Sequence, residues 1–259
     1  MVVSGLHQIF SKHPGLRSHR IGLALSGGSV RGLAHIGVVK VLAEAGIAPA
    51  AITGSSAGSL IGALLASGMD WREVAALARN VFWPKLLHGE SLERFCAEHL
   101  PLDFAGLKIP FAAIGTELPS KRAMVITEGD LASAISASCA MRVVRGTVKR
   151  EGKRLKDGGI ACVLPSEACR ALGADFIIGS DVWEVSSLLR GVGIHPQHPR
   201  ATSLYPSRYH VSLRQTDLLI HPRIPLAGYL PGPQAVERMI AAGERAARRA
   251  LDRFATQAA

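Results

Sequence analysis

Residues 21–58 decide the fold, and they read IGLALSGGSVRGLAHIGVVKVLAEAGIAPAAITGSSAG. The apolar run over residues 21–25 predicts a strand that ends in a glycine-rich turn. Residues 32–45 carry apolar side chains at helical spacing, and residues 51–53 predict a second short strand that runs into another sharp turn. Strands that alternate with helices in this way are typical of an α/β fold with a mainly parallel sheet.

The predicted helix over residues 32–45 has two different faces. Its apolar side chains recur every three residues, at Leu33, Ile36, Val39 and Leu42. The polar side chains fall on the other side, at His35, Lys40 and Glu44. We therefore expect the apolar face to pack on the sheet and the polar face to lie away from it.

The same alternation continues along most of the chain. Further strands are predicted over residues 109–114, 123–127 and 176–179, and a charged hairpin over residues 147–155. Further helices are predicted over residues 59–67, 71–82, 91–99, 131–138, 166–172 and 234–254. Asp70 and Glu73 form a capping-box pattern that predicts where the helix over residues 71–82 begins. Residues 183–223 are rich in His, Pro and Arg, show little periodicity and predict a long loop or lid.

The composition is that of a globular chain with a large core. The chain has 259 residues, of which 48% are hydrophobic and 19% are charged, and these values exclude intrinsic disorder and collagen-like sequence. We expect residues 1–19 to be a polar N-terminal extension and residues 20–259 to form one domain. No C-x-x-C pair occurs, so the four cysteines indicate free thiols in a reducing compartment. They are Cys96, Cys139, Cys162 and Cys169.

Neither a secretory signal nor a membrane span is predicted. Residues 1–20 lack the apolar region of a signal peptide. The longest apolar stretch, residues 57–69, is too short to cross a bilayer and is interrupted by serine and glycine. We therefore expect a cytoplasmic protein, with no more than peripheral contact with a membrane.

Gly54-Ser55-Ser56-Ala57-Gly58 places a serine in a G-x-S-x-G pattern between a predicted strand and a predicted helix. A nucleophile held at such an elbow is strained and needs small neighbours, because the backbone passes close to other strands. A plain tight turn is the alternative interpretation of the pattern taken alone. The strand before it and the apolar helix after it favour Ser56 as a nucleophile.

Ser26-Gly27-Gly28-Ser29-Val30-Arg31-Gly32 is a second turn between a predicted strand and a predicted helix. The backbone N–H groups of such a turn point at an anion, with help from the helix dipole, so the turn predicts an oxyanion hole or a phosphate cradle. A dinucleotide site would need glycine in place of Ser29 and an acidic residue about 20 positions further on. Residues 49–53 contain no acidic residue, which disfavours that interpretation.

Asp157-Gly158-Gly159 is by itself an ordinary turn sequence. Together with the two earlier motifs, it makes the chain resemble the patatin-like phospholipases, which carry G-G-G-x-R-G, G-x-S-x-G and D-G-G/A in this order. These motifs stand here at residues 27–32, 54–58 and 157–159. Residues 35–38 and 116–117 also resemble the bacterial branch of that family. The resemblance implies a three-layer α/β sandwich with a mainly parallel central sheet flanked by helices.

The resemblance also implies a serine lipid acyl hydrolase with a Ser–Asp dyad and no metal or cofactor. Ser56 would attack the carbonyl of a lipid ester, and Asp157 would act as the general base. Backbone N–H groups of Gly27, Gly28 and Ser29 would stabilise the oxyanion, and Arg31 would hold the loop or a lipid phosphate. The chemistry of a weak nucleophile requires the same parts, namely an adjacent base and preorganised donors.

Two positions depart from the family pattern. Ser29 replaces the third glycine of the first motif, and it would be strained if that position requires a positive φ angle. Arg142 stands where the family has the proline of a serine–isoleucine–proline stretch, and it would alter a wall of the site. Both departures suggest a second hypothesis, a degenerate and weakly catalytic scaffold that binds anionic membrane lipid.

A Ser–Asp–His triad is a third hypothesis. The chain order of the α/β-hydrolases would be satisfied by Asp175 or Asp181 followed by one of several histidines. These histidines are His195, His198, His210 and His221. The elbow at Ser56 follows only the second predicted strand, whereas the elbow of an α/β-hydrolase lies after several strands, so the dyad is favoured.

The charge of the chain is strongly positive, +10 at pH 7, and it is concentrated before Asp157. Residues 142–156 hold seven basic residues against Glu151 alone. They are Arg142, Arg145, Lys149, Arg150, Lys153, Arg154 and Lys156. A solvated hairpin and a docking patch for an anionic membrane both fit this segment, and each basic residue at such a membrane contributes about 1 kcal/mol. Aromatic residues are only 5% of the chain and no reader motif is present, so nucleic acid is disfavoured, and no oligomeric state is predicted.

Overall fold

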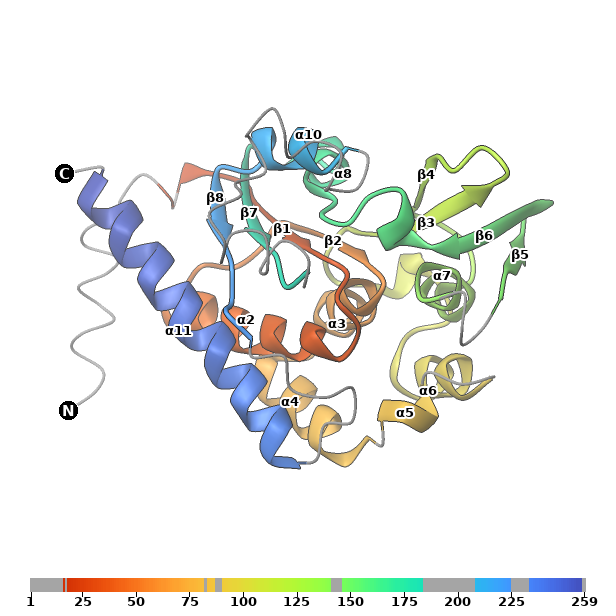
Figure 1. Cartoon of the computed structure of the whole chain (residues 1–259), viewed down its shortest axis with the longest axis horizontal. Coiled ribbons are helices and arrows are strands. Elements are labelled where there is room, and N and C mark those ends of the chain that lie inside the picture. The colour runs from red at the N-terminus through yellow and green to blue at the C-terminus, as the bar shows by residue number, and fades with distance from the viewer. Residues whose placement is uncertain are drawn as a thin grey trace.

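The fold is built on one mixed β-sheet (Figure 1). The computed structural model describes residues 16, 18–81, 83–86, 90–140, 146–183, 208–224 and 233–257. In these ranges the strand order is β5-β6-β3-β2-β1-β7-β8, and β4 also pairs with β3. The strands are β1 (Ile21–Leu25), β2 (Ala51–Ser55), β3 (Phe111–Leu118), β4 (Ala123–Ile126), β5 (Val148–Arg150), β6 (Lys153–Asp157), β7 (Phe176–Ser180) and β8 (Leu218–Ile220).

The centre of the sheet is parallel and one end is antiparallel. β1 pairs in parallel with β2 and with β7, β2 with β3, and β7 with β8. The pairs β3–β4, β3–β6 and β5–β6 are antiparallel. All residues of β1 and β2 are buried, because helices cover both faces of a parallel sheet, and this explains why the two strands lack polar alternation.

Helices cover the two faces and make the three layers that were expected (Figure 1). On one face, α8 and α10 pack with Ala24, Ile177 and Tyr209 in a small apolar cluster. On the other face, α2, α3 and α11 enclose the large core around Leu23, Leu25 and Ile52. The helices are α2 (Ala34–Glu44), α3 (Ala57–Ala66), α4 (Trp71–Asn80), α5 (Trp83–Leu86), α6 (Ser91–His99), α7 (Leu131–Ser138), α8 (Ser166–Ala171), α10 (Tyr209–Arg214) and α11 (Pro233–Gln257).

Two glycines allow α2 and α11 to lie directly against each other. A Cβ atom on Gly37 would lie 1.9 Å from the carbonyl oxygen of Ile240, and one on Gly243 would lie 1.9 Å from that of Ala34. Beside this contact, Lys40 Nζ lies 2.9 Å from a carboxylate oxygen of Glu244. The polar residues of α2 are therefore divided between its interface with α11 and the interior.

His35 and the start of its helix differ from the expectation. A 3-10 turn over Ser29–Leu33 precedes α2, and His35 is fully buried rather than on an outer face. Its Nδ1 lies 2.8 Å from Ser180 Oγ and its Nε2 lies 3.0 Å from the carbonyl oxygen of Ser26. Burial lowers the pKa of His35 to about 4, so the neutral ring joins β1 to β7.

The expectation of a long loop over residues 183–223 is wrong in its second half. Residues 209–214 form α10, and residues 218–220 form β8, which extends the sheet beyond β7. Both elements are shorter than the windows in which periodicity becomes visible, which is why the sequence pattern does not reveal them. Residues 184–207 lie outside the described residues.

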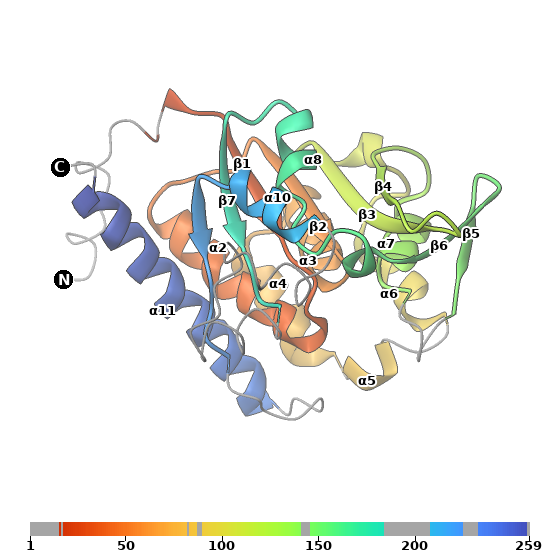
Figure 2. The same ribbon diagram turned by 45° about the horizontal axis from the view of Figure 1, so that its top comes forward.

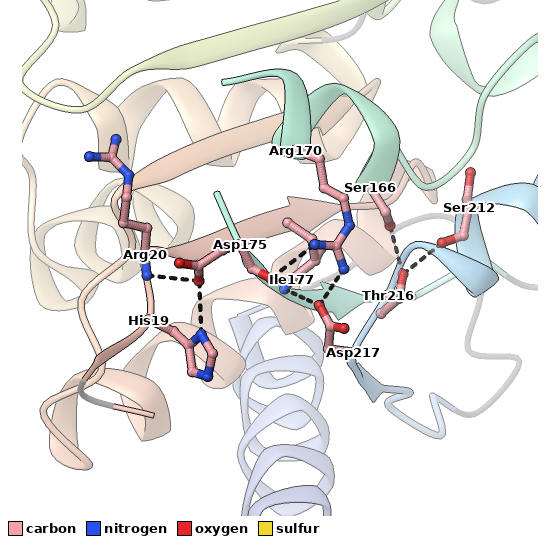
Figure 3. A network of polar contacts seen from close by, with 9 residues as sticks. All are labelled: His19, Arg20, Ser166, Arg170, Asp175, Ile177, Ser212, Thr216 and Asp217. Atoms are coloured by element: carbon pink, nitrogen blue, oxygen red, sulfur yellow. Dashed lines mark hydrogen bonds and ion pairs between the residues drawn. The ribbon is translucent and has the colours of Figure 1, made fainter. Parts of the chain in front are cut away.

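The amino ends of β1, β7 and β8 are joined by a polar network (Figure 3). Asp175 accepts hydrogen bonds from the backbone N–H of Arg20 at 3.0 Å and contacts His19 Nδ1 at 3.0 Å. Asp217 accepts from Arg170 at 2.6 Å and from the N–H of Ile177 at 2.7 Å.

None of the helices in the described ranges has the length and apolar character that a bilayer crossing requires.

Candidate active site

Ser56 sits at a strained elbow between β2 and α3. Its φ and ψ angles are 50° and −124°, a conformation that L-residues rarely adopt. A Cβ atom on Gly54 would lie 2.3 Å from the carbonyl oxygen of Gly58, and one on Gly58 would lie 2.4 Å from that of Leu25. Both flanking positions therefore require glycine, which is the physical basis of the G-x-S-x-G pattern here.

Asp157 lies against Ser56, although 101 positions separate them in the chain. Ser56 Oγ donates a hydrogen bond of 2.6 Å to Asp157 Oδ2, and the N–H of Gly159 donates one of 2.9 Å to Oδ1. The backbone of Asp157 is held at both ends, because its N–H donates to Ala140 and its carbonyl accepts from Thr116 Oγ1. The carboxylate is thus fixed in position beside the hydroxyl.

Burial controls the charge of this carboxylate. Asp157 is 8% exposed, and burial raises its pKa from 3.8 to about 6. The hydrogen bonds from Ser56 and Gly159 favour the charged form and limit this rise. Asp157 is therefore ionised at neutral pH and is a stronger proton acceptor than an ordinary aspartate.

The glycine-rich turn lies against the elbow. A Cβ atom on Gly27 would lie 3.4 Å from Ser56 Cβ. The N–H of Gly27 donates to the carbonyl of Val163 at 3.0 Å, so this group is already engaged and does not point at a substrate. Ser29 has a φ angle of 53°, which is the positive value at which a serine is strained. Ser29 also lines the same cavity as Ser56.

Arg31 ties this turn to the end of β7. Its Nε donates to the carbonyl of Val182 at 3.3 Å. The N–H of Val182 donates in turn to Ser26 Oγ at 2.8 Å, and a Cβ atom on Gly28 would lie 2.8 Å from the Val182 side chain. The first segment after β7 therefore contacts the turn at Ser26, Gly28 and Arg31, and the expected role of Arg31 in holding the loop or a lipid phosphate stays a prediction.

An apolar cavity opens beside the Ser56 hydroxyl. Apart from Ser29 and Ser56, its lining is almost entirely hydrocarbon or sulfur, from the elbow, α3, α5, α6 and the end of α7. Its apolar lining residues include Val30, Leu33, Leu60, Ile61, Trp83 and Leu92. Such a cavity favours an apolar chain over a charged or strongly hydrated group.

The sequence profile of the patatin-like phospholipases matches residues 23–169, more than half of the chain. The chain belongs to the patatin-like phospholipase family. All three motifs and both members of the Ser56–Asp157 pair lie within the matched residues.

Curated relatives of this patatin-like chain occur in bacteria and animals. An NTE family protein of Mycobacterium tuberculosis is 32% identical over 184 residues, which cover 63% of this chain and 49% of that protein. The neuropathy target esterase sws of Drosophila melanogaster is 29% identical over 188 residues, which cover 64% of this chain and 13% of that protein. The chain thus spans about half the length of its mycobacterial relatives and a smaller share of the animal ones.

Two solved structures share the fold of this patatin-like chain. VipD from Legionella pneumophila superposes with a TM-score of 0.63 at 14% identity, over 90% of this chain and 67% of that one. The type III effector protein ExoU superposes with a TM-score of 0.51 at 16% identity, over 92% of this chain and 53% of that one. Both likenesses show the three-layer α/β architecture.

The two acids of the triad hypothesis and His221 lie in other networks of the patatin-like fold. Asp181 accepts a hydrogen bond from the hydroxyl of Tyr209, and its Oδ2 lies 3.3 Å from His221 Nδ1. Asp175 contacts His19. Among the described residues, the carboxylate that bonds Ser56 is that of Asp157. His195 and His198 lie outside the described residues.

Three supporting residues of the site escaped the sequence analysis. Ser138 Oγ accepts from the N–H of Ser56 at 2.9 Å, and Ser59 Oγ donates to the carbonyl of Ser56 at 2.6 Å. Thr116 Oγ1 holds the carbonyl of Asp157 and accepts from the N–H of Ala161 at 3.1 Å. Their only sequence signal is a hydroxyl in an otherwise apolar buried element, which also occurs where no site exists.

The basic segment before Asp157 does not present all its charges to solvent. Arg150 is buried and donates to the carbonyls of Asp130 and Glu128, so its expected place in a docking patch is wrong. Its guanidinium instead binds the backbone just before α7. Arg142 and Arg145 lie outside the described residues, so the expected effect of Arg142 on a wall of the site stays a prediction.

Proposed function

We propose that this chain is a serine lipid acyl hydrolase, a phospholipase or esterase that uses Ser56 and Asp157 as a dyad. The observation that carries the proposal is the 2.6 Å hydrogen bond from Ser56 Oγ to the buried Asp157 carboxylate. Membership of the patatin-like phospholipase family supports the same activity. The apolar lining of the cavity that Ser56 shares supports an acyl chain as the bound group.

Acylation begins with transfer of the Ser56 hydroxyl proton to Asp157 while Ser56 Oγ bonds to the ester carbonyl carbon. The tetrahedral intermediate then breaks its bond to the leaving alcohol, which takes the proton from Asp157. Deacylation repeats these steps with water, whose proton passes to Asp157 as its oxygen attacks the acyl carbonyl. The fatty acid leaves, and Ser56 Oγ recovers the proton.

The N–H groups of Gly28 and Ser29 are the proposed oxyanion donors. Gly27 is removed from this set because its N–H is bonded to Val163. The turn lies against Ser56, and Arg31 and Val182 hold its backbone in place before any substrate binds. Preorganisation of this kind is typically worth about 3 kcal/mol per donor in the transition state.

A fluorophosphonate probe with peptide mapping tests the dyad. We expect the wild-type chain to be labelled at Ser56 and to hydrolyse a soluble short-chain ester. Ser56→Ala should lose both properties, and Asp157→Asn should lose at least about a thousandfold in kcat because the base is absent. The matched controls are Ser67→Ala and Asp175→Asn, which should keep the label and the turnover.

Two results would contradict the dyad. Turnover that persists in Ser56→Ala would exclude Ser56 as the nucleophile. Loss of turnover in His221→Ala with the fold intact would favour the triad, because His221 contacts Asp181 and not Asp157.

The degenerate lipid-binding scaffold is the second candidate function, and the strained Ser29 favours it. One experimental outcome would distinguish this scaffold from the dyad hydrolase. A wild-type chain that binds vesicles but is neither labelled nor active on esters of any chain length would establish it.

A further inference from the structure

The antiparallel end of the sheet separates its charges by face. Side chains alternate along a strand, so Leu155 and Asp157 point to the side where α7 packs, together with Arg150 on β5. Lys149, Arg154 and Lys156 point to the opposite side. Lys149 and Arg154 stand directly opposite each other across the β5–β6 pair. We call these three cations the basic face.

Nothing in the described part of the chain neutralises the basic face. No hydrogen bond or ion pair joins its three side chains to the described residues. The nearby glutamates pair with other cations, Glu117 with Lys153 and Glu151 with Arg150. Like charges placed directly opposite each other destabilise a sheet, so an anionic partner would offset a repulsion already built into the fold.

Exposed apolar side chains accompany the cations. Val125 on β4 is 48% exposed, and it pairs with Ile114, two positions before Thr116. Thr116 pairs with Lys156, so Val125 and Lys156 point to the same side of the sheet. Ile160 is 44% exposed, and the next residue donates its N–H to Thr116 Oγ1. These two are among the three most exposed large apolar side chains of the described residues.

We propose that the basic face, with Val125 and Ile160, docks the protein onto an anionic lipid bilayer. Cations bordered by exposed apolar groups match a surface of anionic headgroups over hydrocarbon, whereas single-stranded nucleic acid would require stacking aromatics, and none is among these five residues. The proposal rests on the lipid substrate proposed above. Lys156 immediately precedes Asp157, but the two side chains point to opposite faces of β6, so a bilayer bound there lies across the sheet from the Asp157 carboxylate.

The shape of the molecule provides a control for net charge. The β5–β6 hairpin projects from one end, and α11 lies at the opposite end in both views (Figures 1 and 2). Arg238, Arg245 and Arg249 are exposed on α11. Replacing them with serine removes the same charge as replacing Lys149, Arg154 and Lys156 with serine. Only the second change should affect docking.

Co-sedimentation with phosphatidylcholine vesicles, with and without phosphatidylserine, tests docking. Both triple variants are made in the Ser56→Ala chain, so that the vesicles are not hydrolysed. We expect the parent to bind only vesicles that contain phosphatidylserine. The basic-face variant should bind them about 100-fold more weakly, while the α11 variant should bind like the parent. If the triple variant misfolds, the double variant Lys149→Glu/Arg154→Glu takes its place, and it should also bind phosphatidylserine vesicles more weakly than the parent.

Three outcomes would overturn the proposal. Equal losses in the two triple variants would indicate an effect of net charge. Binding of the basic face to a single-stranded oligonucleotide more tightly than to phosphatidylserine vesicles would identify nucleic acid as its partner. If the Ser56→Ala chain binds neither kind of vesicle while the wild-type chain hydrolyses a soluble ester, docking is rejected and the hydrolase is not. If the chain binds vesicles but the wild type is not labelled at Ser56, the hydrolase is rejected and docking is not.

Discussion

Ser29 holds a backbone conformation that glycine adopts without strain. At a φ angle of 53° a serine costs roughly 1–2 kcal/mol, and glycine recovers part of this at the expense of a more flexible unfolded chain. We expect Ser29→Gly to raise the free energy of unfolding by about 0.5–1 kcal/mol in urea titrations. Ester turnover should be equal or higher, because the proposed oxyanion donors would relax into better alignment.

Ser67→Gly is the matched control for this change. Ser67 caps α3 with a φ angle of −68°, which serine adopts freely, so the same replacement there should lower stability. A Ser29→Gly chain that is less stable than the wild type would show that the hydroxyl contributes more than the backbone strain costs.

The proposed role of Asp157 as a base predicts that activity depends on pH. Because burial raises its pKa to about 6, the carboxyl is protonated and cannot act as a base at lower pH. We expect kcat/KM on a soluble ester to rise about tenfold per pH unit up to about pH 6 and to level off above it. A profile that levels off near pH 4 would contradict the raised pKa.

The same raised pKa affects stability with a definite sign. Between about pH 4 and about pH 6 the folded chain keeps the Asp157 proton while the unfolded chain releases it, so stability falls as pH rises through this window. Relative to Asp157→Asn, the wild type should lose about 2 kcal/mol of unfolding free energy between about pH 4 and about pH 7. Urea titrations of both chains at the two pH values measure this difference.

At the scale of elements, the start of α4 is specified locally. Asp70 Oδ1 accepts from the N–H groups of Arg72 and Glu73, and Glu73 Oε2 accepts from the N–H of Asp70 at 2.8 Å. The capping box predicted from sequence is therefore confirmed. Asp70→Ala should lower the free energy of unfolding by about 1 kcal/mol, whereas Asp70→Asn should retain most of it. Equal losses in both variants would indicate that charge, not capping, is responsible.

Local pattern also predicted α6 and α7 with the bounds that the structure has. Both are helices whose ends carry ordinary signals, such as Asp130, which accepts from the N–H of Ser133 at 2.6 Å. The elements that were missed include α5, α10 and β8. The last two derive their stability from tertiary contacts, because α10 packs on α8 and β8 pairs with β7. Elements of three to six residues carry too little periodicity to be recognised alone.

At the scale of the whole molecule, the candidate site and the polar network lie at opposite ends of the parallel strands. The elbow, the glycine-rich turn and Val182 lie at the carboxyl ends of β2, β1 and β7, whereas the network of Figure 3 joins the amino ends of β1, β7 and β8. Asp217→Ala would leave the N–H of Ile177 without its acceptor and would remove the carboxylate partner of Arg170, which keeps its hydrogen bond to the carbonyl of Asp175. We expect it to lower stability by about 1–3 kcal/mol without changing Ser56 labelling below the melting temperature.

Asp252→Ala is the control for that variant. Asp252 is exposed on α11, and its loss should change stability by less than about 0.5 kcal/mol. Reduced labelling of Ser56 in a folded Asp217→Ala chain would show that the two ends of the sheet are coupled.

The sequence by itself determined the strand–helix–strand start, the elbow at Ser56 and the order of the three motifs, because each depends on residues that are neighbours in the chain. Only the tertiary structure decided that the N–H of Gly27 is bonded to Val163, where the charge of Arg150 goes and which cations share a face. Those outcomes depend on Val163, Glu128 and the strand register, and contacts between distant segments leave no local pattern. The approach of Asp157 to Ser56 lies between the two: family resemblance predicted the pair, and sheet pairing of β6 with β3 brings it together.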